Sequence, residues 1–87
     1  MTKITIIDYK NHPIRLLNLP EVANDQWSWW VIVGKPDNSR SSIGCHWVET
    51  KDDALEWGKR LVEATIRGTA WDFILASEKH GAMPEVI

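Results

Sequence analysis

Hydrophobic and polar residues are distributed along the first twenty positions in a pattern that predicts two strands. Residues 3–9 and 14–19 are rich in isoleucine and leucine, and their composition is typical of strands. Residues 10–13 between them, Lys-Asn-His-Pro, have the composition of a turn, and Pro20 ends the second strand. The sequence therefore predicts an antiparallel hairpin at the start of the chain.

An uncharged stretch at residues 27–33, Trp-Ser-Trp-Trp-Val-Ile-Val, predicts the central strand of the protein. It holds three of the six tryptophans and consists largely of aromatic and β-branched residues, which favour strands. Residues 41–48 have the composition of a return strand. Pro36, Asp37 and Asn38 lie between the two and suit a three-residue hairpin loop that ends in a left-handed residue.

The length of that loop decides which residues of the second hairpin face the core. An even-length loop would put Ser42, Gly44 and His46 on the core side, whereas an odd-length loop makes that side entirely apolar. Because the buried face sets the register of a strand, the odd loop is predicted. The predicted core face consists of Trp27, Trp29, Val31, Val33, Ile43, Cys45 and Trp47. Trp30, Ile32 and His46 are expected on the opposite face.

Helix signals follow at residue 50 and end at residue 68. Thr50 can cap the free amides at the start of a helix, and Asp53 occupies the capping-box position. Gly68 favours termination. Small and apolar residues recur at helical spacing and predict the side that packs on the sheet. They are Ala54, Gly58, Leu61, Val62 and Thr65.

Residues 69–80 fit either of two elements. Their Thr-x-x-Asp start, together with the Lys-His-Gly that follows, predicts a second helix with Trp71, Ile74 and Leu75 turned inward. The alternative is a strand in which Trp71, Phe73 and Leu75 alternate with polar or small neighbours. The helix is the preferred interpretation.

The predicted fold class is α+β, with an antiparallel four-stranded β-meander followed by one or two C-terminal helices packed on one face of the sheet. The chain has 87 residues, of which 44% are hydrophobic and 25% are charged, as in a globular protein with room for one core. Residues 1–87 are therefore expected to form one small domain, with residues 82–87 as a loose tail.

Net charge and the length of apolar runs narrow the classes of function. The formal charge is −2, whereas nucleic-acid-binding domains usually carry a basic excess. No stretch reaches the roughly 18 apolar residues of a membrane span, and the N-terminal residues do not resemble a secretory signal. One cysteine cannot form an internal disulfide. The sequence therefore predicts a soluble, cytoplasmic protein.

Candidate catalytic and metal-binding residues are few. Cys45 and His46 are adjacent, and adjacent residues on a strand point to opposite faces, so they cannot act together. Cys45 is predicted to be a core thiol. The five glycines are isolated, no metal ligands are paired at short spacing, and the carboxylates of the predicted helix occupy solvent positions. We therefore expect no enzyme activity, no cofactor and no metal site.

The remaining function class is binding, and the face opposite the predicted core is the candidate surface. Interface centres are enriched in tryptophan, which favours a protein partner. The predicted contact residues are Trp30, Ile32 and His46, with Lys35 and Arg40 at the edge. The alternative is a nucleic-acid-binding domain in which the exposed tryptophan stacks on a base and the two hairpin cations hold phosphates. A free edge strand could also pair two copies into a homodimer.

A β-meander followed by a capped helix is loosely similar to the antitoxin half of HicA–HicB pairs and to the sheet-and-helix half of double-stranded-RNA-binding domains. The first helix and the basic helix start of the latter are missing here, and no family motif is present. In length, slight acidity and lack of catalytic motifs, the chain also resembles phage-encoded inhibitors of host enzymes. That resemblance implies a small intracellular inhibitor or a regulatory subunit.

Overall fold

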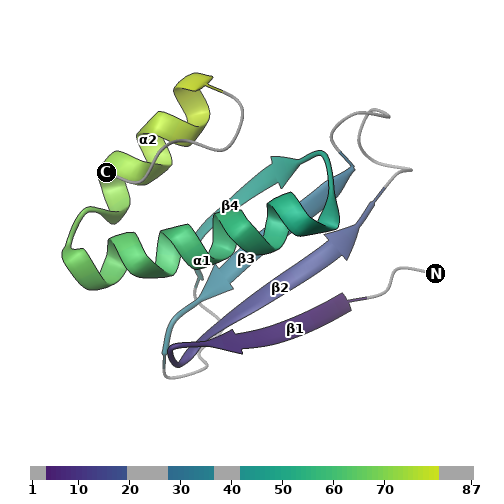
Figure 1. Ribbon diagram of the computed structural model, residues 1–87, viewed down its shortest axis with the longest axis horizontal. Coiled ribbons are helices and arrows are strands. Elements are labelled where there is room, and N and C mark those ends of the chain that lie inside the picture. Colours follow the sequence, from purple (N-terminus) through teal and green to yellow (C-terminus); the bar gives the residue numbers. More distant parts are fainter. Residues whose placement is uncertain (1–3, 20–27, 37–41, 81–87) are drawn as a thin grey trace.

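A computed structural model describes residues 4–19, 28–36 and 42–80 of the chain, with side chains up to residue 77. These residues form an antiparallel four-stranded sheet in the order β1-β2-β3-β4, followed by two helices (Figure 1). The elements are β1 (Ile4–Tyr9), β2 (His12–Asn18), β3 (Trp29–Gly34), β4 (Ser42–Val48), α1 (Lys51–Arg67) and α2 (Ala70–His80). The predicted α+β meander is confirmed. Neither helix is long and apolar enough to cross a membrane.

The hairpin between β1 and β2 turns on two residues rather than four. Lys10 and Asn11 both have positive φ, 49° and 70°, as a type I′ turn requires, and Tyr9 pairs directly with His12. Strand β2 therefore begins at His12, and Pro13 lies within it. Proline has no N–H to donate, and the Gly34 carbonyl oxygen instead accepts a hydrogen bond from His12 Nδ1 at 3.0 Å.

The predicted register between β3 and β4, which put Cys45 and Trp47 on the core face and His46 on the opposite face, is wrong. Trp30 lies opposite Trp47, Val31 opposite His46 and Val33 opposite Gly44. The cause is a bulge between Val33 and Gly34. The pair of Gly34 with Ser42 agrees with the predicted facing. The next pair is Val33 with Gly44, so Ile43 is an extra residue on β4, and it reverses the facing of every later residue of that strand. Trp27, and Asp37 and Asn38 of the predicted three-residue loop, lie outside the residues that the structure describes.

Packing against α1 explains why Gly44 and His46 lie on the covered face of the sheet. A Cβ atom at Gly44 would lie 2.7 Å from Leu61 Cδ2, so the glycine makes room for α1. The His46 ring stacks on the Trp57 ring, with centroids 5.2 Å apart and planes inclined by 21°. The space that α1 needs therefore places Gly44 and His46 on the covered face, although the number of apolar residues on each face favours the opposite arrangement.

The core lies between the sheet and α1 and is centred on Trp57, which the predicted inward stripe did not include. Trp57 is completely buried and packs on Phe73 at 5.6 Å between ring centroids. Its indole Nε1 donates to Ser77 Oγ at 2.9 Å, and that hydroxyl donates to the Phe73 carbonyl. The buried apolar residues around it are Ile14, Leu16, Val31, Val33, Val48, Ala54, Leu61, Val62 and Ala64.

Both ends of α1 form as predicted. Thr50 Oγ1 accepts a hydrogen bond from the backbone N–H of Asp53 at 3.1 Å. Gly68 has φ of 81° and caps the C-terminal end in the left-handed conformation. Gly58 brings the helix close to β2, because a Cβ atom there would lie 2.7 Å from Ile14 Cγ2.

The second helix is confirmed, but two of its predicted inward residues point outward. Phe73 and Ser77 are buried, and Ile74 packs against the core. Trp71 and Leu75 are 68% and 44% exposed. The alternative strand over residues 69–80 is thereby contradicted. The side of α2 that carries Phe73 faces the core, because the Phe73 ring packs on Trp57.

Candidate functional site

Side chains on the outer face of the sheet, the face away from α1, form an apolar surface. All four strands contribute to it, because every second residue of a strand points to that side. Both helices follow the sheet in the chain, and in Figure 1 α1 crosses one face only. The apolar residues of the outer face are Ile4, Ile6, Leu17, Trp30, Ile32, Cys45 and Trp47.

Trp30 and Trp47 form the centre of this outer face. They lie opposite each other on β3 and β4, with ring centroids 4.8 Å apart and planes inclined by 48°. On the other side of Trp30, β2 places Leu17 directly opposite it. Each tryptophan is half-buried by its neighbours and keeps part of its surface accessible. The pair is therefore held in a fixed arrangement and still presents apolar area to a partner.

The structure brings together two of the five predicted contact residues and separates a third from them. Trp30 and Ile32 lie on the outer face, as predicted. The prediction for His46 is wrong, because the register places its ring against Trp57 on the covered face. Lys35 is exposed just after β3, and Arg40 lies outside the described residues.

Sequence reasoning missed several members of the outer face. Trp47 was assigned to the core because the bulge was not foreseen. Ile4 and Ile6 are 56% and 61% exposed, and the strand composition of residues 3–9 did not indicate that they face outward. The alternation of Ile4 and Ile6 with Thr5 indicates that the two isoleucines share one face of the strand. The sequence does not tell which face this is, because that depends on which side of β2 the helix covers.

Cys45 lies on the outer face and is exposed, so the prediction of a core thiol is wrong. Its position next to Trp47 follows from the same reversal of facing after the bulge. Partial burial among its neighbours raises the pKa of the Cys45 thiol. The thiol form, which is a weak nucleophile, therefore predominates near neutral pH.

The hairpin between β1 and β2 is tied to α1 by a polar cluster on the covered side of the sheet. The Tyr9 hydroxyl donates to Glu63 Oε1 at 2.8 Å, and Lys10 forms an ion pair with the same oxygen. The Lys10 and Lys59 ammonium nitrogens each lie 5.6 Å from the centroid of the Tyr9 ring. These contacts connect a loop at one end of the chain to the middle of α1.

The pKa shifts in this cluster indicate a structural role. The hydrogen bond to Glu63 raises the pKa values of Tyr9 and Lys10. Hydrogen bonds from Lys10 and Tyr9 lower the pKa of Glu63. A general acid or base works best with a pKa near the operating pH, and each of these shifts leads away from neutrality. The cluster therefore joins elements and does not provide a group poised for proton transfer.

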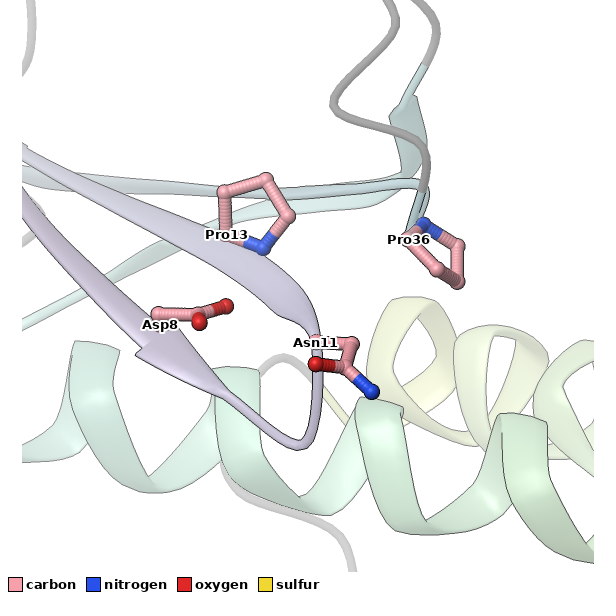
Figure 2. Close-up of a pocket in the computed structure, with 4 residues that line it drawn as sticks. All are labelled: Asp8, Asn11, Pro13 and Pro36. Carbon is pink, nitrogen blue, oxygen red and sulfur yellow. The ribbon is translucent and has the colours of Figure 1, made fainter.

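A shallow hollow of about 320 Å³ lies beside the first hairpin, lined by Asp8, Asn11, Pro13 and Pro36 (Figure 2). Its polar groups are one carboxylate and one carboxamide, and the two prolines supply rigid apolar walls. None of its lining residues is a cation, a thiol or a hydroxyl. Within the described ranges, no group of three or more His, Cys, Asp and Glu side chains is placed to hold a metal ion.

Comparisons with known proteins do not assign the chain to a family. No family model, no curated protein and no solved structure matches it.

Proposed function

We propose that the protein is a non-enzymatic binding module, a small intracellular inhibitor or regulatory subunit, that contacts a protein partner through the outer face of its sheet. The observation that carries this proposal is the Trp30–Trp47 pair at the centre of an apolar face that no described helix covers. Trp30 and Ile32 remain proposed contacts, and Trp47 and Leu17 join them.

Apolar continuity supports a protein partner. Contiguous apolar patches on soluble proteins commonly mark sites of interaction, and tryptophan is enriched among the residues that dominate binding energy. Ile4 and Ile6 extend the patch from the tryptophan pair to the β1 edge. Because the two indole rings already pack on each other, a partner would order few additional rotamers when it binds.

Charge on the outer face favours a protein over a nucleic acid. Arg15 lies opposite Ile32, and Asp8 lies opposite Pro13 on the same face, so cation and anion offset each other. Lys35 adds one exposed cation at the end of β3. A nucleic-acid site needs a groove of positive charge beside its aromatic residues, and the whole chain carries a formal charge of −2.

Site-specific photocrosslinking tests the proposal in cells that naturally contain the protein. A benzophenone amino acid at Ile32 should cross-link to one protein partner, and a Trp47→Ala substitution in the same chain should abolish the product. The matched control places the benzophenone at Glu56, on the solvent side of α1, where no product is expected. A product that forms equally at both positions would contradict the assignment to the outer face.

The nucleic-acid alternative is tested with single-stranded and double-stranded oligonucleotides of mixed sequence. If the purified chain bound either of them with an affinity that falls steeply as salt rises, and if Trp30→Ala abolished that binding, the protein-partner proposal would be wrong. We expect no such binding.

A further inference from the structure

We infer that the β1 edge pairs with β1 of a second copy of this chain, antiparallel about a twofold axis, so that two sheets join into one. This inference goes beyond the proposed function, because it concerns the backbone edge of the sheet and not the tryptophans of the outer face. In Figure 1, β1 lies at the open side of the sheet, and β2 is its neighbour on the other side.

The hairpin geometry identifies which backbone groups of β1 are available. In a two-residue hairpin the residues that flank the loop exchange both hydrogen bonds, and here these are Tyr9 and His12. Ile7 and Thr5 then also bond to β2, because hydrogen-bonded and non-bonded pairs alternate. The residues that direct their N–H and C=O groups away from β2 are Ile4, Ile6 and Asp8.

Strand β1 lacks the features by which proteins usually protect an exposed edge. Between Ile4 and Tyr9 it has no proline, no lysine and no bulge, and its pairing with β2 is regular throughout. Asp8 is its one charged residue. Ile4 and Ile6, the large side chains next to the edge, are more than half exposed. Such an edge is a ready template for a further strand.

The opposite edge of the sheet is less suited to pairing. Strand β4 is irregular near its start, where the bulge interrupts its register with β3. Ile74 of α2 packs on the covered face of β4, because its Cδ1 atom would lie 3.3 Å from a Cβ atom at Gly44. Bulges discourage edge-to-edge pairing. Of the two edges, β1 has the regular register, and no described helix lies along it.

A second copy is the partner that this edge fits. An antiparallel pair centred on Ile6 places Ile6 opposite its own symmetry mate and Ile4 opposite Asp8 of the other copy. This register matches all three outward-facing residues at once, and it sets the exposed isoleucines at the centre. A twofold axis perpendicular to the sheet keeps both helical layers on one side. Helix α1 packs over β2, β3 and β4, so the second copy has room beside β1.

The size of the contact predicts a dimer that dissociates on dilution. A strand of six residues is only about 20 Å long, and pairing it buries less than the roughly 1,200 Å² of a standard stable interface. We therefore expect the association to depend on concentration. The joined sheet would also connect the two outer faces into one surface with two tryptophan pairs.

Sedimentation of the full chain over a roughly hundredfold range of concentration tests the inference. The wild-type protein should pass from monomer to dimer. Ile6→Pro removes the outward N–H at the centre of the edge and should weaken dimerisation by at least about tenfold, while Ile6→Val keeps that N–H and should preserve it. Ile32→Lys, on the outer face, should also leave the dimer intact. A wild-type chain that stays monomeric, or a dimer that Ile32→Lys abolishes, would overturn the inference.

Amide hydrogen exchange on the wild-type protein gives a second measurement, which does not require the proline variant to fold. The amides of Ile6 and Asp8 should exchange more slowly as the concentration rises, whereas the amide of Ser42 on β4 should not change. If the Ile6 amide exchanges at the same rate at every concentration, the edge is not paired. Either negative result leaves the proposed partner at the outer face untouched, because that proposal is measured by cross-linking at Ile32.

Discussion

The two faces of the sheet differ in a way that the polarity of their side chains does not predict. The face that α1 covers includes Gly44 and His46, whereas the uncovered face carries Trp30 and Trp47. On the covered face the helix decides what fits, because Leu61 occupies the space above the glycine and Trp57 lies against the imidazole ring. The outer face has no such neighbour among the described elements. Shape complementarity with α1, more than the number of apolar residues, therefore distinguishes the two faces.

Truncation of Trp57 should cause the largest loss of stability. Trp57→Ala empties the centre of the covered face, removes the donor to Ser77 and removes the ring that stacks on His46. Large-to-small substitutions of this kind cost about 3–5 kcal/mol, which is a large part of the stability of a small domain. Urea unfolding followed by circular dichroism measures the loss.

The matched control for that variant is Trp71→Ala. Trp71 is 68% exposed on α2, and its truncation should change the free energy of unfolding by less than about 0.5 kcal/mol. If the two tryptophan variants lost similar stability, the core would not be centred on Trp57. That result would contradict the claim that α1 determines which residues belong on the covered face.

An added side chain at Gly44 should destabilise the protein by an intermediate amount. Its Cβ atom alone would come within 2.7 Å of Leu61, so Gly44→Val overpacks the covered face at a cost of about 1–3 kcal/mol. Cys45→Val, one residue further on the outer face, places the same valine side chain where α1 does not pack. It should shift the midpoint of urea unfolding by far less than Gly44→Val. Equal shifts would mean that Gly44 does not face α1.

The coupling between Trp30 and Trp47 should be smaller but specific. A double-mutant cycle with Trp30→Ala and Trp47→Ala should give an interaction energy of about 0.5–1.5 kcal/mol, as for other aromatic pairs in contact. The register predicted from sequence puts the two rings on opposite faces and predicts no coupling. A cycle between Trp30 and the distant Trp71 is the control. Additive effects of Trp30→Ala and Trp47→Ala would contradict the pairing of Trp30 with Trp47.

Local signals in the sequence were sufficient for most of the elements. The cap at Thr50, the stop at Gly68 and the strand composition of four segments each depend on a few neighbouring residues. The cap and the stop are found where predicted, and the four strands are found close to their predicted ranges, with β2 beginning two residues early at His12. The second hairpin shows where this reasoning fails. One extra residue at the Val33–Gly34 bulge reverses the facing of all later positions, and no local pattern marks that residue.

The candidate site was predictable only in part for the same reason. Trp30 and Ile32 precede the bulge along β3, and their outward facing was predicted correctly. Trp47 and His46 follow it on β4 and were therefore exchanged between the faces. For α2, Trp71 and Phe73 are both large and apolar, and only the position of Trp57 on the neighbouring helix decides which of them is buried.

The smallest predicted effect concerns the polar cluster that holds β1 and its hairpin to the covered side. Because Lys10 and Tyr9 lower the pKa of Glu63, the ionised carboxylate stabilises the folded state. That contribution is complete above the ordinary Glu63 value of about 4.5 and is lost as the pH falls through the lowered folded value. The wild-type protein should therefore be more stable than Glu63→Gln at pH 7, and the difference should shrink below about pH 4.5.

Urea unfolding of both proteins across this pH range measures the difference, which should stay small because Lys10 is exposed and Glu63 only half-buried, so that solvent screens the pair. Glu56→Gln is the matched control, since its partner Arg60 lies on the same helix and the pair connects no separate elements. A stability difference for Glu63→Gln that is equally large at pH 7 and pH 3 would show that the cluster acts through packing instead of charge. The linkage of β1 to α1 would then depend on packing of the Tyr9 ring on the covered face.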